Sequence, residues 1–405
     1  MIKISRRNFL MFSGLNSALF LKFRGRKKPF PTLPQKSSLP TSCDPWIELS
    51  LEHMAWNLDK IRKTVKVPIM AVIKANGYGH GLVEVGHYLE KKGIDYLMVG
   101  KLQEAMHLRK AGVSCPILNF GSFSPEDAEE IIQNDISQSV FTEEVSRLNQ
   151  TSLRIGKKAK IHLHIDTGMG RMGIFYHRAL PYIEKVSSME GLSVEGISTA
   201  LTEDEDFDKE QLRRFLHLCQ EAESKGISLG LKHAASSDGI LDLPNAHLDM
   251  VRPGIALYGY YPSEKTQKED ILHLRPVLQL KSRVVAVKSL RPGDSLSYHR
   301  KFTAKKREKI AIIPVGYSDG YPPQVVNKAS VLIKGKRFPL IAAITANHCV
   351  ALLEEDSNIS IRDEVILIGF QGEEKITAEE VAHWAEVSAY KVLIGLNPLL
   401  PRIIA

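Results

Sequence analysis

A lysine stands directly before a glycine-rich loop in the segment 71–81, which reads AVIKANGYGHG. Lys74 follows the apolar pair Val72 and Ile73, and an amine enclosed by apolar side chains can form a Schiff base with a carbonyl compound. The small residues after it would let backbone amides approach a phosphate. The same spacing also fits a solvated lysine before a turn, so this segment alone leaves both interpretations open.

A second glycine-rich stretch, Gly168 to Gly173, satisfies the G-x-G-x-x-G pattern of dinucleotide-binding loops. A single match to this pattern is weak evidence. Arg171 and Met172 are bulky, and Pro181 follows soon after them, which is a poor start for the closely packed helix that the pattern requires. We therefore do not expect a nicotinamide-dependent oxidoreductase.

Short apolar runs alternate with segments of helical period from Val67 onward, which is typical of an α/β fold with a parallel sheet. The expected strands are 67–74, 96–99, 116–120, 137–141, 160–165, 194–198, 231–234 and 250–257. Helical patterns lie between them, for example at 82–92, 102–111, 125–133 and 209–225. The number of runs favours a (β/α)8 TIM-type barrel over an open sheet, and the active site of such a barrel lies at the carboxyl ends of its strands. Lys74 is therefore expected at the barrel mouth.

The pattern changes after the polar segment 262–270, where β-branched, alternating runs with close turns begin. Runs at 277–288, 309–315, 330–333, 341–353 and 365–369 predict a second domain that is rich in β-strands. We divide the chain into a leader and spacer at 1–45, a barrel with its N-terminal lead-in at 46–271, and a C-terminal β-rich domain at 272–405.

The chain of 405 residues carries a formal net charge of +8, and 43% of its residues are hydrophobic. This composition excludes fibrous and disordered proteins. Nine Lys and Arg and no acid lie within residues 1–43, which leaves 45 basic against 46 acidic residues in the rest of the chain. A basic surface for nucleic acid is therefore not expected. Neither a disulfide framework nor a metal site is expected, because no Cys-x-x-Cys or Cys/His ligand spacing occurs at Cys43, Cys115, Cys219 and Cys349.

The leader resembles a twin-arginine export signal, with Arg6 and Arg7 followed by an apolar stretch to about Phe23. This stretch is shorter than the ~20 apolar residues of a membrane-spanning helix, so no integral membrane segment is expected. The basic run at 24–28 and the absence of a clear cleavage site fit a cytoplasmic extension instead. Both the periplasm or cell envelope and the cytoplasm stay open as locations.

Four segments resemble, in the same order, motifs of the alanine racemases, a family that uses pyridoxal 5'-phosphate. They are 71–81, DTGMGRMG at 166–173, DMVRPGIALYG at 249–259 and VGYSDGYP at 315–322, and the resemblance runs from about Trp46 to the C-terminus. It implies a barrel that holds the cofactor, a C-terminal β domain and a homodimer with shared active sites. The implied reaction interconverts L- and D-alanine by proton transfer between two bases and supplies D-alanine for peptidoglycan.

The resemblance also implies roles for individual residues. Lys74 matches the Schiff-base lysine, which is one acid/base group, and Tyr298 matches the opposing one. Arg252 matches the arginine that faces the pyridine nitrogen. Arg171 matches the arginine near the substrate carboxylate, and Tyr317 matches a tyrosine at the entrance. The positions that hold the phosphate are matched by Tyr78, Ser237, Gly254, Ile255 and Tyr390.

Several positions depart from the family pattern. His164 stands where many members carry a lysine that can be carbamylated, Ala200 where a histidine faces the cofactor ring, and Ser236 where an asparagine precedes the phosphate-binding serine. Ala346 and Asn347 replace a methionine and an aspartate. The small Ala346 side chain predicts room for substrates larger than alanine. Two alternatives remain: an envelope racemase of broad specificity, and a non-catalytic relative that only binds the cofactor.

Overall fold

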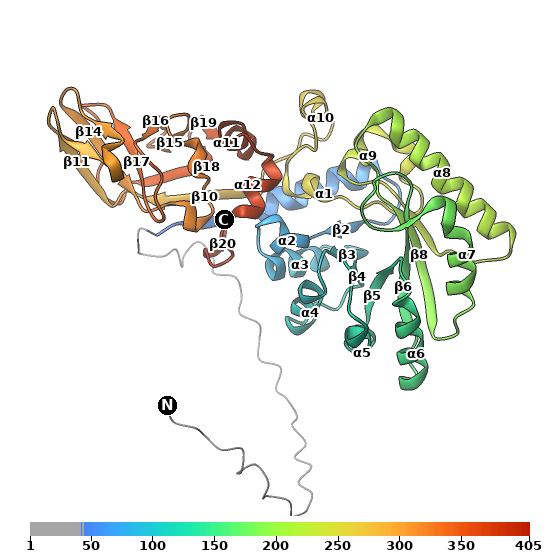
Figure 1. Cartoon of the computed structure of the whole chain (residues 1–405). Helices are drawn as coiled ribbons and strands as arrows, with labels where there is room; N and C mark the ends of the chain where they lie inside the picture. Colours follow the sequence, from blue (N-terminus) through green and yellow to red (C-terminus); the bar gives the residue numbers. More distant parts are fainter. Residues whose placement is uncertain (1–41, 43) are drawn as a thin grey trace, which may run out of the picture. The chain divides into compact units, whose positions relative to one another are not determined.

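The computed structural model describes residue 42 and residues 44–405 of the chain (Figure 1). The export motif and most of the predicted leader lie outside these residues. Within the described part of the chain, no helix is both long and apolar enough to cross a membrane.

Parallel strands form the barrel that the sequence predicts. Their order is β2-β3-β4-β5-β6-β8-β9, and every neighbouring pair is parallel. The strands are β2 (Met70–Val72), β3 (Tyr96–Val99), β4 (Ile117–Asn119), β5 (Ile136–Val140), β6 (Ala159–Asp166), β8 (Leu192–Thr199) and β9 (Leu231–His233). A short strand, β7 (Ile174–Phe175), pairs with β6 beside this path.

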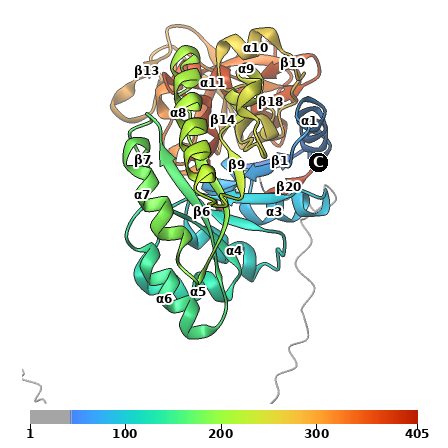
Figure 2. The ribbon, with the colours of Figure 1, turned by 90° about the vertical axis from the view of Figure 1, so that its right-hand side faces the viewer.

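Helices follow the strands on the outside of the barrel, and Figure 2 shows α6, α7 and α8 in succession along one side of the sheet. Apolar residues at helical spacing bury one face of each of these helices. The helices of this part are α1 (Leu51–Thr64), α2 (Lys74–Tyr78), α3 (Leu82–Lys91), α4 (Leu102–Lys110), α5 (Ala128–Gln133), α6 (Val145–Ile155), α7 (Tyr176–Ser187), α8 (Glu205–Ser224), α9 (Ser237–Asp242) and α10 (Glu264–Glu269).

The eighth strand, which we expect at 250–257, is reduced to a single bridge between Ile69 and Val251. The amide of Met70 donates to the Val251 carbonyl and the amide of Val72 to the Pro253 carbonyl, each at 2.9 Å, and these bonds close the barrel. Pro253 has no amide hydrogen to continue a ladder, and the chain turns into the 3₁₀ helix η4 (Ile255–Tyr258). The prediction of a strand to residue 257 is therefore wrong, although the barrel is formed.

The C-terminal part is built on a ten-stranded sheet in the order β11-β14-β17-β16-β15-β18-β10-β1-β20, with β19 paired to β18. Its strands are β1 (Trp46–Leu49), β10 (Leu278–Arg283), β11 (Ala286–Leu290), β14 (Glu308–Ile313), β15 (Ser330–Ile333), β16 (Lys336–Ile341), β17 (Cys349–Leu353), β18 (Glu364–Gln371), β19 (Glu374–Ile376) and β20 (Arg402–Ile404). β1 pairs with β10 and β20, although we group its residues with the barrel. The run expected at 341–353 is divided by a loop at 342–348 that carries Ala346.

The C-terminal part also contacts the loop after Lys74. The helix α12 (Ala389–Gly395) packs against α2 (Lys74–Tyr78), and a side-chain nitrogen of Arg402 in β20 donates to the Gly79 carbonyl at 2.9 Å. One continuous apolar core includes residues of both parts. The loop after Lys74 is thus held by the barrel and by the last helix and strand of the same chain.

Candidate active site

Lys74 lies just beyond the carboxyl end of β2, where the backbone makes a left-handed turn. Residues 75–78 all have φ between +52 and +60°. A left-handed conformation costs about 1–2 kcal/mol for each residue with a side chain, so the turn needs support from its neighbours. The Asn76 side chain accepts from the Leu82 amide at 2.9 Å, and Glu104 accepts from the Asn76 amide at 3.3 Å.

The surroundings of Lys74 lower the pKa of its amine. Burial among protein atoms is the largest cause of a lowered pKa of Lys74, and the positive charge of Arg171 lowers it further, while Glu104 and Glu203 act in the opposite direction. A Cβ atom added to Gly100 would lie 3.4 Å from the Lys74 Cβ atom, so the lysine stem lies along the end of β3. A lowered pKa increases the fraction of free amine, which is the form that attacks a carbonyl.

Ser237 joins two backbone segments into a cradle of small groups. Its hydroxyl oxygen accepts from the amides of Gly254 at 3.0 Å and Ala256 at 3.2 Å, and Ile255 lies between them. A Cβ atom on Gly254 would lie 2.6 Å from the Tyr78 hydroxyl oxygen, so any larger residue would displace the tyrosine. Three of the residues matched to phosphate binding, together with Tyr78, therefore meet at one place.

Tyr78 belongs to an aromatic cluster that includes the remaining phosphate-binding candidate. Its ring centroid lies 4.9 Å from that of Tyr258 and 5.8 Å from that of Tyr390 on α12. A Cβ atom on Gly79 would lie 2.0 Å from the Leu393 carbonyl oxygen, so α12 packs directly on the loop. Burial raises the pKa of both Tyr78 and Tyr390, which keeps their hydroxyl groups protonated.

Arg252 is a buried cation held in one orientation. Its two terminal nitrogens donate to the carbonyl oxygens of His233, Ala234 and Thr199 and to His233 Nδ1, at 2.6 to 2.9 Å. Because a guanidinium can only donate, His233 Nδ1 must accept, and its Nε2 then donates to Nδ1 of His162 at 2.9 Å. Burial lowers the pKa of Arg252 to about 10, so Arg252 stays charged at neutral pH.

His164 does not replace the negative charge that a carbamylated lysine would bring. It is buried, and its Nδ1 lies 3.0 Å from the Ser198 hydroxyl oxygen. Burial lowers the pKa of His164 to about 3, with contributions from the positive charges of Arg252 and Arg171. The imidazole is therefore neutral at physiological pH and cannot form an ion pair with Arg171.

The loop that carries Arg171 is held at its base by Asp166, the last residue of β6. One carboxylate oxygen of Asp166 accepts from the amides of Gly168 at 2.9 Å and Gly170 at 3.1 Å. The loop leads into β7 and only then into α7, which begins at Tyr176. The G-x-G-x-x-G match is therefore followed by a strand, whereas a dinucleotide-binding loop opens a helix.

The candidate residues of the β-rich part lie on its surface. Tyr298 is 79% exposed and Tyr317 is 55% exposed. The Tyr317 amide donates to Thr345 and the Ser318 amide to Ala346, so the loops that carry Tyr317 and Ala346 are bonded together. Across the described residues of one chain, no hydrogen bond, ion pair or ring contact joins Tyr298, Tyr317 or Ala346 to Lys74.

The sequence analysis missed the polar residues that support the site. Asp208 and Gln211 lie on the buried face of α8, and His233 and Thr199 hold Arg252. The signal for the helix residues was present in the sequence, since polar side chains at helical spacing among apolar ones must find buried partners.

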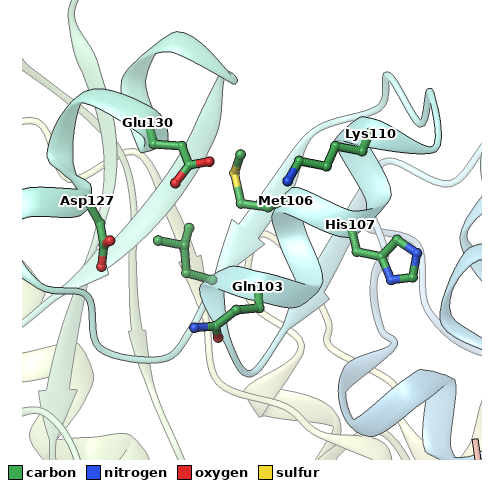
Figure 3. Close-up of a pocket in the computed structure, with 7 residues that line it drawn as sticks. Gln103, Met106, His107, Lys110, Asp127 and Glu130 are labelled. Atoms are coloured by element: carbon green, nitrogen blue, oxygen red, sulfur yellow. The ribbon is translucent and has the colours of Figure 1, made fainter. Parts of the chain in front are cut away.

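A groove of about 390 Å³ on the outside of the barrel is separate from this site (Figure 3). It is lined by residues of α4, of α5 and of the turn that leads into α5, and none of the site candidates is among them. The lining residues are Leu102, Gln103, Met106, His107, Lys110, Asp127 and Glu130.

The chain matches two family models along most of its length. Residues 49–262 match the alanine racemase N-terminal domain, and residues 277–404 match the alanine racemase C-terminal domain. Alanine racemase 2 of Caldanaerobacter subterraneus subsp. tengcongensis is 38% identical over 365 residues, which are 88% of this chain and 94% of that protein. The alanine racemase of Methanococcus maripaludis is 37% identical over 366 residues, which are 88% of this chain and 98% of that protein.

Solved structures of alanine racemases are similar to this chain over most of its length. The alanine racemase of Clostridium difficile 630 superposes with a TM-score of 0.85 at 34% identity, covering 89% of this chain and 96% of that one. The alanine racemase of Bacillus anthracis with bound L-Ala-P has a TM-score of 0.85 at 31% identity, covering 90% of this chain and 96% of that one.

Proposed function

Because the chain belongs to the alanine racemase family, we propose that it is a pyridoxal-phosphate-dependent racemase that interconverts L- and D-alanine. The observation that carries this proposal is the arrangement at the barrel mouth. A lysine with a lowered pKa, a buried arginine and a cradle of backbone amides around Ser237 come from the ends of successive barrel strands.

The residues present fit pyridoxal phosphate. Gly254 leaves room beside the Tyr78 hydroxyl that a Cβ atom would fill. A phosphate bound there would meet the hydroxyl groups of Tyr78 and Ser237, and it would take the place of the Ser237 oxygen as acceptor for the amides of Gly254 and Ala256. Arg252 is only 6% exposed, and among the described residues no carboxylate pairs with it. Arg252 keeps its proton, so it is a poor proton donor to a pyridine nitrogen. A pyridine ring that faces Arg252 would therefore stay unprotonated.

The proposed roles follow from these positions. Lys74 would hold the cofactor through its amine, and Ser237, Tyr78 and Tyr390 would hold the phosphate. The bound cofactor supplies an electron sink for the electron pair that remains when the Cα proton leaves. Lys74 would move this proton on one face of the substrate. A second acid/base group is needed on the opposite face, and Arg171 would hold the substrate carboxylate near Lys74.

We assign the second acid/base group to Tyr298 of the partner subunit in a homodimer. In one chain Tyr298 and Tyr317 are exposed and have no contact with Lys74, which supports a site completed by another copy. Mixing equal amounts of Lys74→Ala and Tyr298→Phe protein, with exchange of subunits, should then restore about a quarter of the native activity, because half of the dimers are mixed and each has one intact site. No recovery after subunit exchange would contradict the shared site.

The racemase activity is tested by incubating the purified protein with L-alanine and with D-alanine and separating the products by chiral chromatography. We expect both reactions to reach the same mixture of enantiomers, together with a visible absorbance from the lysine-bound cofactor. A colourless protein that leaves both enantiomers unchanged after addition of pyridoxal phosphate would overturn the proposal. A coloured protein without turnover would indicate the non-catalytic relative.

We further propose that residues 1–45 are an export leader, and that the D-alanine formed supplies peptidoglycan. The twin-arginine motif at 5–10 supports export, and the match to the family begins only at residue 49. Fractionation of cells that express the native chain or the Arg6→Lys, Arg7→Lys variant tests this. Retention of the variant in the cytoplasm is expected, and an unchanged distribution would favour a cytoplasmic extension.

A further inference from the structure

Gln211 occupies a buried position where two loops of the barrel mouth meet. It lies on α8, is 0% exposed, and its side-chain nitrogen donates to the Thr167 hydroxyl at 3.2 Å and to the Ala200 carbonyl at 3.1 Å. Its side-chain oxygen accepts from the Thr202 amide and hydroxyl, both at 3.0 Å. Both donors and both acceptor positions of the Gln211 amide therefore face a partner, and the Asp208 carboxylate shares the Thr202 amide and hydroxyl with it, at 2.8 and 2.9 Å.

The partners of Gln211 fix the orientation of its amide. A carbonyl oxygen such as that of Ala200 can only accept, and the Thr202 amide can only donate. Reversing the side-chain amide would therefore break both bonds. No other side chain of similar size provides two donors and an acceptor from one planar group, so a polar residue on the apolar face of α8 has a specific reason to be there.

The two loops held by Gln211 serve different parts of the site. Thr167 begins the loop that carries Arg171, while Ala200 and Thr202 follow the end of β8. The Thr167 hydroxyl also lies 2.7 Å from the Thr199 hydroxyl, and the Thr199 carbonyl accepts from Arg252 at 2.7 Å. A continuous set of hydrogen bonds thus leads from Gln211 through Thr167 and Thr199 to Arg252.

We propose that Gln211 is a positioning residue, which holds the loop of Arg171 at a fixed place relative to β8 and Arg252. This inference rests on the proposed function, because it assigns Arg171 to the substrate carboxylate. His164 gives Arg171 no ionic partner, so other contacts must hold the Arg171 loop in place. The backbone of the Arg171 loop is held at its base by Asp166. At Thr167 it is held by Gln211 and by Arg214 of the same helix, whose guanidinium donates to the Thr167 carbonyl at 2.9 Å.

The test replaces Gln211 by Met, which has similar volume and makes none of the four hydrogen bonds. The matched control is Gln220→Met, at an exposed position of the same helix. We expect Gln211→Met to retain the cofactor absorbance and to lose about 10- to 100-fold in kcat/KM for L-alanine, mainly through KM, because small misplacements of positioned groups have effects of this size. The control should match the native protein, and an unchanged KM in Gln211→Met would overturn the inference.

Hydrogen exchange gives a second measurement that does not need turnover. The amides of Gly168 and Gly170 should exchange faster in Gln211→Met than in the control, since their loop has lost one of its supports. Equal exchange in both variants would overturn the role of Gln211. Failure of the native protein to racemise alanine would instead overturn the proposed function, so the two failures are distinguishable.

A pair of variants at Thr167 covers the case in which Gln211→Met does not fold. Thr167→Val keeps the shape and removes the hydroxyl that Gln211 contacts, whereas Thr167→Ser keeps the hydroxyl. The serine variant should retain the native KM and exchange, and the valine variant should show the changes expected of Gln211→Met. Equal behaviour of the two would also contradict the inference.

Discussion

The two halves of the candidate site are held in different ways. In the barrel, Arg252 is 6% exposed and makes four hydrogen bonds, and Tyr78 is packed between two other tyrosines. In the β-rich part, Tyr298 is 79% exposed. One chain therefore builds the half that would bind the cofactor, and it presents Tyr298, the proposed second acid/base group, outward.

Both halves contain residues with a strained backbone, but the contacts that hold these residues in place differ. The left-handed turn after Lys74 is covered by α12, and Asn76 within it is hydrogen-bonded to Glu104 and to the Leu82 amide. The residues Ser297, His299 and Arg300 around Tyr298 also have positive φ, yet they lie in an exposed hairpin between β12 (Ser295–Leu296) and β13 (Phe302–Thr303). A strained backbone persists where surrounding contacts fix it, so in the proposed homodimer this hairpin would gain its fixed geometry from contacts with the other subunit.

The largest effect is expected from Lys74→Ala, which removes the only amine proposed for the barrel half. Racemisation and the visible absorbance of the bound cofactor should both disappear, because Lys74 is the amine proposed to hold the cofactor covalently. Spectra and chiral chromatography of the purified variant measure both properties. Undiminished turnover would contradict the assignment of Lys74 as the amine that holds the cofactor.

Tyr298→Phe should affect turnover without affecting cofactor binding, and so distinguish the roles of the two halves. Its cofactor absorbance should match that of the native protein, since the barrel half is intact, while turnover should fall by ~10² to 10⁴-fold because one proton-transfer group is lost. Tyr317→Phe provides a comparison on the same surface and should lose much less. A loss below about tenfold for Tyr298→Phe would remove it from the acid/base role.

Ala346→Met should narrow the substrate range by adding bulk to the β-rich half. One methylene in an apolar pocket changes discrimination by ~1 to 3 kcal/mol, so native protein should act on serine or larger amino acids beside alanine, and the variant should shift the kcat/KM ratio toward alanine by tens of fold. The Ala346 backbone is bonded to Ser318, so the substitution should leave the loop in place. Equal ratios in both proteins would show that neighbouring side chains already fill the space.

Local sequence patterns predicted the barrel well where each strand pairs with its neighbours along its length. The strand at 96–99 is found with the predicted bounds. The stretch at 250–257 has equally apolar residues, but Pro253 removes a donor and the chain turns away. The pairing of β1 with β10 and β20 joins segments more than two hundred residues apart, and no periodicity within either segment shows such a partner.

The motifs supplied candidate residues for the site, but not the contacts that hold them. Lys74, Arg252 and Ser237 are candidates because their segments resemble those of a family, and their roles stay predictions. The contacts of Gln211 with Thr167 and Ala200 depend on how α8 lies over two strand ends, and this is a property of the tertiary structure. The sequence showed only that a polar residue stands on an apolar helix face.

The smallest expected effect concerns pH and tests whether the barrel half alone prepares Lys74 for the cofactor. Burial and the charge of Arg171 lower the pKa of Lys74, and the free amine is the form that reacts with an aldehyde. The rate at which cofactor-free protein takes up pyridoxal phosphate should therefore rise with pH and level off at a pH below the ordinary lysine value.

Arg171→Gln removes a positive charge, so the pKa of Lys74 should rise and the inflection should move to higher pH. Arg178→Gln, on the exposed face of α7, should leave it unchanged. No substrate is present in this measurement, so a shift in Arg171→Gln reports on the charge beside Lys74 and not on substrate binding. An identical inflection in the two variants would show that the charge of Arg171 does not lower the pKa of Lys74.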